Sequence, residues 1–324
     1  MTPRAKGQPD EAAPSAESRP RRRRPALAAA LLCITLPAAA VLVEGTSYLL
    51  ANRSTGTITV NGHERAYLAH VPRSHDPSIP APLVVSLHSG GLWASAQRDI
   101  SRWNELADRE GFVVAYPSGV GRASPRKWSA GPGPGLLRDV DFIMQMIDTL
   151  VAEHGLDPER VYVNGLSNGG GMTFALSCAA PERVAAAGIV AGAQTLAWEL
   201  CPERVMPPVI VIHGTEDPVV PYRGGRTWIT PTPFPDVAGW VGTWAERNGC
   251  DAAPVEGAYS ATVTRRTYTG CGAGADVVLY TVHGDGHVWP GGGPVPRWLL
   301  GPDSGSLDAT RVMWEFFRGR RAGG

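Results

Sequence analysis

One stretch in the middle of the chain limits what the rest can fold into. A β-branched run begins at Val161 and leads into Gly165-Leu166-Ser167-Asn168-Gly169, and an apolar helix is predicted from about Met172. A serine in such a tight turn has a strained backbone, and side chains at the two glycines would collide with the adjoining strand or helix. The hydroxyl is left exposed beside the free N–H groups of a helix N-terminus. Because the chain has 39 glycines, the pattern alone can arise by chance, but its position between a strand and a helix favours a nucleophile.

Strands and helices are predicted to alternate along the chain. Asn61-Gly62 between the β-branched runs 57–60 and 65–71 is typical of a two-residue hairpin. Buried apolar runs and amphipathic segments then follow one another. Besides the strand before Ser167, strands are predicted at 82–88, 112–116, 184–190, 205–212, 262–268 and 277–282, and helices at 100–110, 139–153, 234–248 and 307–318. This alternation predicts an α/β fold, a mostly parallel sheet with helices on both faces and an antiparallel hairpin at its start.

Three residues that follow predicted strands have the chemistry of a nucleophilic hydrolase. A serine hydroxyl needs a histidine to accept its proton, and that histidine needs a carboxylate to fix its tautomer. Ser167, Asp217 and His287 occur in this order, each in a loop after a strand, and such loops meet at one edge of a parallel sheet. Glu216 is the alternative acid and His283 the alternative base. A turn-capping aspartate and a surface-loop histidine are the plain structural interpretations of the same residues.

The developing oxyanion of acyl transfer needs two backbone N–H donors. Asn168, directly after the serine, is predicted to supply one of them. The loop after the strand 82–88 is predicted to supply the other, from Ser89 or Gly90. The alternative is that this glycine-rich loop is only a flexible turn.

The first 51 residues are interpreted as a targeting region. Residues 1–24 contain seven Lys/Arg and three Asp/Glu, a net charge of +4, so the rest of this neutral 324-residue chain carries −4. The polar stretch 1–24 is expected to be disordered. The apolar run within residues 25–51 fits either a cleaved signal peptide or a single transmembrane anchor, and both interpretations export residues 52–324 as one catalytic domain. Any membrane contact is expected through this segment alone, and the acidic remainder offers no basic surface for nucleic acid.

The cysteines agree with export. Four of the five lie in the predicted catalytic domain, and an even number in an exported chain suggests two disulfides. The pairs Cys178–Cys201 and Cys250–Cys271 are favoured among the three connectivities because each closes a short loop. A zinc site is the alternative, but no Cys-X-X-Cys spacing supports it.

Taken together, these motifs resemble a known group of α/β-hydrolases. The chain is similar, over about residues 55–318, to polyhydroxybutyrate depolymerase-like and feruloyl-esterase-like extracellular esterases, including the LpqC-type actinobacterial esterases. The matching pieces are residues 83–88, 165–172, 213–222, 248–250 and 286–291.

The resemblance implies carboxylic-ester hydrolysis through an acyl-serine intermediate, without metal or cofactor. It implies that Ser167 is the nucleophile, Asp217 the acid and His287 the base of an exported serine esterase. Ser89 departs from the family, which often has glycine directly after the residue equivalent to His88.

The substrate is expected to be a small or oligomeric ester. Trp289 beside the expected base and Trp128 in a long Gly/Pro-rich loop are candidates for an apolar acyl pocket, although ordinary packing is the alternative for both. His88 is grouped with them as a candidate near the substrate, and with His213 it is expected to pack beneath the site. Two other functions use the same fold: acyl transfer to a cell-envelope sugar, and an inactive envelope or adhesion protein.

Overall fold

The computed structural model describes residues 54–120, 126–203 and 205–323, which belong to the compact unit Asn52–Gly324. The two expected N-terminal segments, residues 1–24 and 25–51, lie outside the described residues. Over the described ranges, no helix combines the length and the apolar character needed to cross a bilayer.

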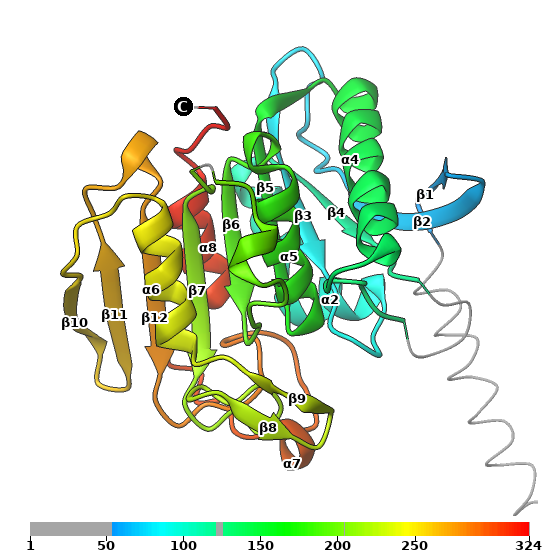
Figure 1. Ribbon diagram of the computed structural model, residues 1–324. Helices are drawn as coiled ribbons and strands as arrows, with labels where there is room; N and C mark the ends of the chain where they lie inside the picture. The colour runs from blue at the N-terminus through cyan, green and yellow to red at the C-terminus, as the bar shows by residue number, and fades with distance from the viewer. Residues whose placement is uncertain (1–53, 121–125, 204, 324) are drawn as a thin grey trace, which may run out of the picture. The chain divides into compact units, whose positions relative to one another are not determined.

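The main sheet has ten strands among the described residues, in the order β1-β2-β4-β3-β5-β6-β7-β12-β11-β10 (Figure 1). The six central strands, β4 to β12 in that order, run parallel, and the strands outside them are antiparallel. This arrangement confirms the predicted α/β fold and its N-terminal hairpin. The bounds are β1 Gly56–Val60, β2 His63–His70, β3 Ala81–Leu87, β4 Val113–Pro117, β5 Leu156–Leu166, β6 Ala186–Val190, β7 Val209–Gly214, β10 Val255–Ser260, β11 Val263–Tyr268 and β12 Val277–Val282.

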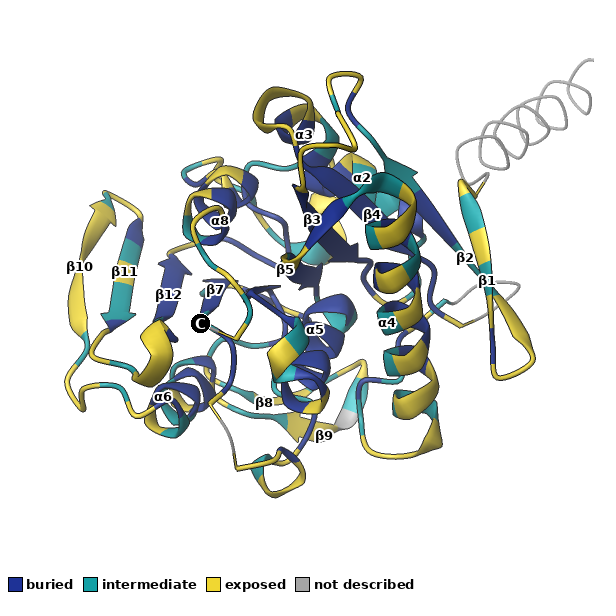
Figure 2. Cartoon of the chain, turned by 90° about the horizontal axis from the view of Figure 1, so that it is seen from above, coloured by how far each residue is buried: buried dark blue, intermediate teal, exposed yellow. Residues whose placement is uncertain are grey.

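Helices cover both faces of the sheet. In Figure 2, α4, α5 and α6 lie on one side of the central strands, and α2, α3 and α8 lie on the other. Successive side chains of a strand point to opposite faces, so Leu83 and Val85 share one core cluster with Phe142 of α4, whereas Val84 shares the other with Trp103 of α3. The bounds are α2 Ala94–Ser101, α3 Trp103–Glu110, α4 Pro134–His154, α5 Asn168–Ala179, α6 Val237–Arg247 and α8 Ala309–Phe317.

Several element boundaries differ from the predictions for local reasons. The helix predicted at 100–110 covers α3 and only the last two residues of α2, so the start of α2 at Ala94 was not predicted. Arg102 has a left-handed backbone (φ 57°) that ends α2 and begins α3. The strand predicted at 205–212 begins only at Val209. A small two-stranded sheet and two other elements were not predicted: β8 Gly225–Thr227 with β9 Thr230–Phe234, the edge strand β10 and the short helix α7 Arg297–Leu300.

Both predicted disulfides are present. Cys178 is bonded to Cys201 across a sequence separation of 23, and Cys250 is bonded to Cys271 across 21. In the chain-entropy model, closing a loop of this size stabilises the folded state by roughly 3 kcal/mol. The first bridge ties the end of α5, the helix that follows Ser167, to the loop after β6.

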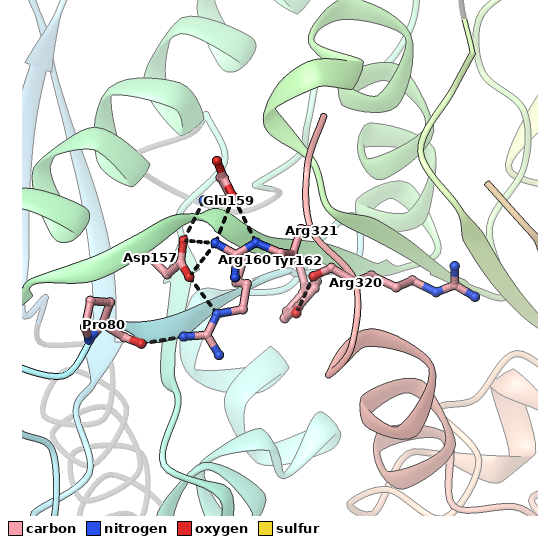
Figure 3. Close-up of polar contacts among 7 residues, drawn as sticks. All are labelled: Pro80, Asp157, Glu159, Arg160, Tyr162, Arg320 and Arg321. Atoms are coloured by element: carbon pink, nitrogen blue, oxygen red, sulfur yellow. Dashed lines mark hydrogen bonds and ion pairs between the residues drawn. The ribbon is translucent and has the colours of Figure 1, made fainter. Parts of the chain in front are cut away.

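The C-terminal segment is fastened to the start of β5 (Figure 3). Arg321 forms ion pairs with Asp157 at 3.1 Å and Glu159 at 2.8 Å, and the Tyr162 hydroxyl donates to the Arg320 carbonyl at 2.9 Å. The two ion pairs lie at the beginning of β5, at the opposite end of that strand from the serine turn.

Candidate active site

Ser167 occupies a strained turn between β5 and α5. Its backbone angles are φ 57° and ψ −117°, a conformation that residues other than glycine rarely adopt. The turn is held because the Ser167 N–H donates to the Val190 carbonyl of β6 at 2.9 Å. The serine is partly exposed at the N-terminus of α5.

The glycines beside the serine are required by close packing. A Cβ atom at Gly165 would collide with the backbone of Gly169, and one at Gly169 would collide with the Leu87 carbonyl of β3. This tight contact also explains where α5 begins. The helix expected from about Met172 begins at Asn168, because packing keeps the glycines in a helical conformation despite their poor propensity.

Asp217 and His287 form a buried pair at the same edge of the sheet. Asp217 follows β7 and His287 follows β12, and these two strands are neighbours. The His287 Nδ1 lies 2.8 Å from Asp217 Oδ2, and both side chains are buried. Since an ionised carboxylate only accepts hydrogen bonds, Nδ1 carries the hydrogen and Nε2 is free to accept a proton. This is the tautomer that a general base needs.

Three further donors surround the Asp217 carboxylate. Its Oδ1 accepts hydrogen bonds from the N–H groups of Val219 and Val220, each at 2.8 Å. His213 Nε2 donates to the Val220 carbonyl at 2.8 Å and also lies 3.3 Å from Oδ2. Burial alone would raise the pKa of Asp217, but hydrogen bonds from His213 and His287 outweigh it and hold the pKa well below the ordinary value. The carboxylate therefore stays charged beside His287.

The alternative acid and base point elsewhere. Glu216 and His283 are both exposed, and His283 also forms a hydrogen bond with the Thr264 hydroxyl of β11 at 2.8 Å. His213 is buried beneath the pair, as expected, and its contact with Asp217 was not foreseen. The two donors from Val219 and Val220 were also missed, although an aspartate followed by a Pro-Val-Val sequence is a signal for a side chain bonded to the next turn.

Ser167 shares this edge but is separated from the pair by one strand, β6, in the sheet order. Among the hydrogen bonds of residues 54–120, 126–203 and 205–323, none joins the Ser167 hydroxyl to His287. Such contacts are often long without substrate and tighten only in the reacting complex. The structure therefore brings together two of the three candidates, and the serine–histidine contact belongs to the functional proposal.

The loop after β3 is organised by His88, which is fully buried. Its Nε2 accepts a hydrogen bond from the Gly119 N–H at 2.9 Å, so its Nδ1 donates to the Ser89 carbonyl, which lies 2.8 Å away. Gly90 lies against Asn168, because a Cβ at Gly90 would be 3.4 Å from the Asn168 Cβ. The candidate oxyanion donors Ser89, Gly90 and Asn168 are thus neighbours in space.

Stability should depend on pH through His88. Burial lowers its pKa to about 4, whereas a histidine of the unfolded chain has a pKa of about 6.5. Between these values only the unfolded chain binds the proton, so the free energy of unfolding should fall by up to about 3 kcal/mol as pH drops from 6.5 to 4. The free energy of unfolding, measured with urea at several pH values, should therefore fall more steeply with decreasing pH for the native protein than for His88→Gln. Equal slopes would contradict the proposed buried, neutral state.

The two tryptophans proposed for a substrate pocket are buried. Trp289 is 1% exposed, and its indole N–H donates to the Thr310 hydroxyl at 2.9 Å. Trp128 is 2% exposed, and its indole N–H donates to the His88 carbonyl at 3.0 Å. These contacts place Trp289 in the core and Trp128 beneath the loop after β3, so neither ring presents a surface to solvent.

Comparison with known proteins identifies the family. The family model described as "Esterase PHB depolymerase" matches residues 70–198. NocK of Nocardia uniformis subsp. tsuyamanensis, whose name describes an esterase, is 32% identical over 83% of this chain and 83% of its own length. The chain belongs to the PHB depolymerase esterase family. Its members are carboxylic-ester hydrolases, and the chain is therefore an enzyme of this class.

Two other proteins are similar to this chain, one in sequence and one in fold. Feruloyl esterase D of Neurospora crassa is 29% identical over 89% of the chain and 94% of its own length. Among solved structures, the acetyl xylan esterase from Aspergillus awamori has a TM-score of 0.58 at 18% identity, covering 72% of this chain and 93% of that one. The structural similarity shows the shared α/β-hydrolase fold.

Proposed function

We propose that this esterase acts through an acyl-serine intermediate, with Ser167 as nucleophile, His287 as general base and Asp217 as the acid that orients it. The supporting observation is the strained serine turn at the sheet edge that also holds the buried Asp217–His287 hydrogen bond, with the histidine in the tautomer that accepts a proton at Nε2. Family membership fixes the class of reaction, and these residues give it a mechanism.

In this mechanism the Ser167 Oγ attacks the ester carbonyl carbon while its proton passes to His287 Nε2. The carbonyl oxygen becomes an oxyanion, which accepts hydrogen bonds from the Asn168 N–H and from Ser89 or Gly90. Collapse of the tetrahedral intermediate expels the alcohol, which takes the proton from His287 and leaves the acyl-serine. Water then attacks the acyl group by the same route and releases the acid.

We further propose aryl and short acyl esters, such as feruloyl esters or hydroxyalkanoate oligomers, as the substrates. The names of the related feruloyl esterase and of the family support this range. The test is a panel of nitrophenyl acetate, nitrophenyl butyrate, methyl ferulate and a 3-hydroxybutyrate trimer. We expect hydrolysis of at least one ester that Ser167→Ala abolishes. A folded protein that hydrolyses none of them would refute the proposed substrate class.

The proposal includes export of the catalytic domain, residues 52–324. The two disulfides support it, because such bonds persist in oxidising compartments outside the cytoplasm. The apolar run within residues 25–51 supplies the signal or anchor. The intact mass of the protein recovered from the native host distinguishes a cleaved signal from an anchor, and a cytoplasmic protein with free thiols would argue against export.

A further inference from the structure

The Asn168 side chain forms a two-sided contact with the loop between β4 and α4. Its Oδ1 accepts a hydrogen bond from the Trp128 N–H at 2.7 Å, and its Nδ2 donates to the Trp128 carbonyl at 3.2 Å. Because one partner is a donor and the other an acceptor, the backbone of Trp128 dictates which way the amide faces. One side chain thus binds both polar groups of a single backbone residue 40 positions away.

The same short segment, residues 126–128, also holds the loop after β3. The Arg126 carbonyl accepts a hydrogen bond from the Gly91 N–H at 2.7 Å, and the Trp128 indole donates to the His88 carbonyl at 3.0 Å. The His88 and Trp128 rings lie 5.1 Å apart. Segment 126–128 therefore contacts the residues on both sides of Ser89 and Gly90, the candidate source of the second oxyanion donor.

The far side of this segment is anchored by a buried ion pair. The Ser129 N–H donates to Asp139 Oδ2 at 2.8 Å, and Asp139 pairs with Arg65 at 2.9 Å. Arg65 also donates to the Ser118 carbonyl at 3.1 Å, where the same loop begins. Segment 126–128 is thus followed directly by a residue bonded to α4, in addition to its contacts with Asn168 and the loop after β3.

We propose that the Asn168 side chain is a positioning residue, which sets the distance between the two oxyanion donors. The Asn168 backbone N–H is one donor. The Asn168 side-chain amide binds segment 126–128, which contacts the loop after β3 that contains the other donor. This inference rests on the proposed function. The Asn168 backbone N–H already has a proposed role as an oxyanion donor, and the Asn168 side chain now has one as well.

Displacement of the oxyanion donors should affect the transition state and not the binding of the ester. An oxyanion exists only after the serine has attacked, so displaced donors raise the barrier without weakening ester binding. We expect Asn168→Ala to lower kcat for nitrophenyl acetate by about 10²-fold, comparable to removal of one donor. KM should change little. The inhibition constant of phenylboronic acid, which forms a tetrahedral adduct with serine, should rise by the factor by which kcat/KM falls.

Asn168→Asp gives a pH readout that a purely structural role would not produce. The introduced carboxyl keeps the acceptor for the Trp128 N–H, but when ionised it repels the Trp128 carbonyl. When protonated it regains a donor for that carbonyl. The activity of this variant relative to the native protein should therefore rise as pH is lowered from about 8 to 5, in the range where carboxyl groups begin to bind protons.

Asn248 provides a matched control. Its Oδ1 accepts from the Met206 N–H at 2.9 Å and its Nδ2 donates to the Ala275 carbonyl at 3.0 Å, the same two-sided contact. It lies near the start of β12, at the opposite end of the strands from the serine turn. Asn248→Ala should lower the unfolding midpoint and leave kcat per active site unchanged.

The experiment measures kcat, KM and the boronic acid inhibition constant for the full-length native protein and the three variants. Active sites are counted by titration with a fluorophosphonate, so that loss of folded protein is not mistaken for loss of catalysis. The proposal is overturned if Asn168→Ala behaves like Asn248→Ala, with a lower unfolding midpoint but native kcat and boronic acid affinity. A native protein that neither hydrolyses esters nor reacts with the fluorophosphonate would overturn the proposed function itself.

Discussion

Replacement of Ser167 by alanine is expected to lower kcat for nitrophenyl ester hydrolysis by about 10⁶-fold, the loss typical of removing the nucleophile of such a triad. Without the hydroxyl no acyl-serine can form, and the remaining rate comes from binding and the oxyanion donors alone. The unfolding midpoint should stay close to that of the native protein, because alanine requires the same backbone at φ 57° and the side chain is only partly buried.

A serine five strands away from β5 in the sheet order serves as the control for that variant. Ser260 lies at the end of β10, an edge strand of the sheet, and Ser260→Ala should retain the native kcat. Initial rates with nitrophenyl acetate, normalised to folded protein by circular dichroism, compare the two variants. A rate for Ser167→Ala within tenfold of the native rate would exclude this serine as the nucleophile.

Asp217→Asn is expected to lower kcat by about 10⁴-fold through the histidine tautomer. The N–H groups of Val219 and Val220 both point at Oδ1, so the amide oxygen must remain there and the amide NH₂ must face His287. The His287 Nδ1 then has to accept a hydrogen bond, which places the ring hydrogen on Nε2. That nitrogen can no longer take the proton of Ser167.

Glu216→Gln is the matched control, since it removes a carboxylate one residue away that is exposed and makes no contact with His287 among the described hydrogen bonds. Its kcat should stay within about twofold of the native value, as for most surface changes remote from the chemistry. The kcat values of Asp217→Asn and Glu216→Gln, measured from pH 6 to 9, decide which of the two residues is the catalytic acid. A larger loss for Glu216→Gln than for Asp217→Asn would reverse the assignment.

The central sheet and the positions of the three candidate residues in loops after strands were predictable because they depend on local sequence. Runs such as residues 83–85 and 209–212 are apolar on both faces, as expected for a strand covered on both sides. The two disulfides followed from short loops in a chain with an even number of cysteines in its catalytic domain. These features needed no knowledge of distant contacts.

Other features depended on contacts between distant segments. The early start of α5 results from glycines pressed against β3, and the break at Arg102 has no glycine or proline to announce it. Trp128 and Trp289 were expected near a substrate because of their neighbours in sequence, but both rings are buried and bonded to residues far along the chain. The two-sided contact of Asn168 with Trp128 likewise spans a loop whose fold the sequence does not reveal.

The most direct test of the account is covalent labelling by a fluorophosphonate, which reacts only with a serine that a neighbouring base has activated. Peptide mass mapping of the labelled native protein should locate one phosphonyl group on Ser167. Labelling should be absent from Ser167→Ala, and it should be strongly slowed in Asp217→Asn. A label on another residue, or no label on a protein that still hydrolyses esters, would contradict the proposed serine mechanism.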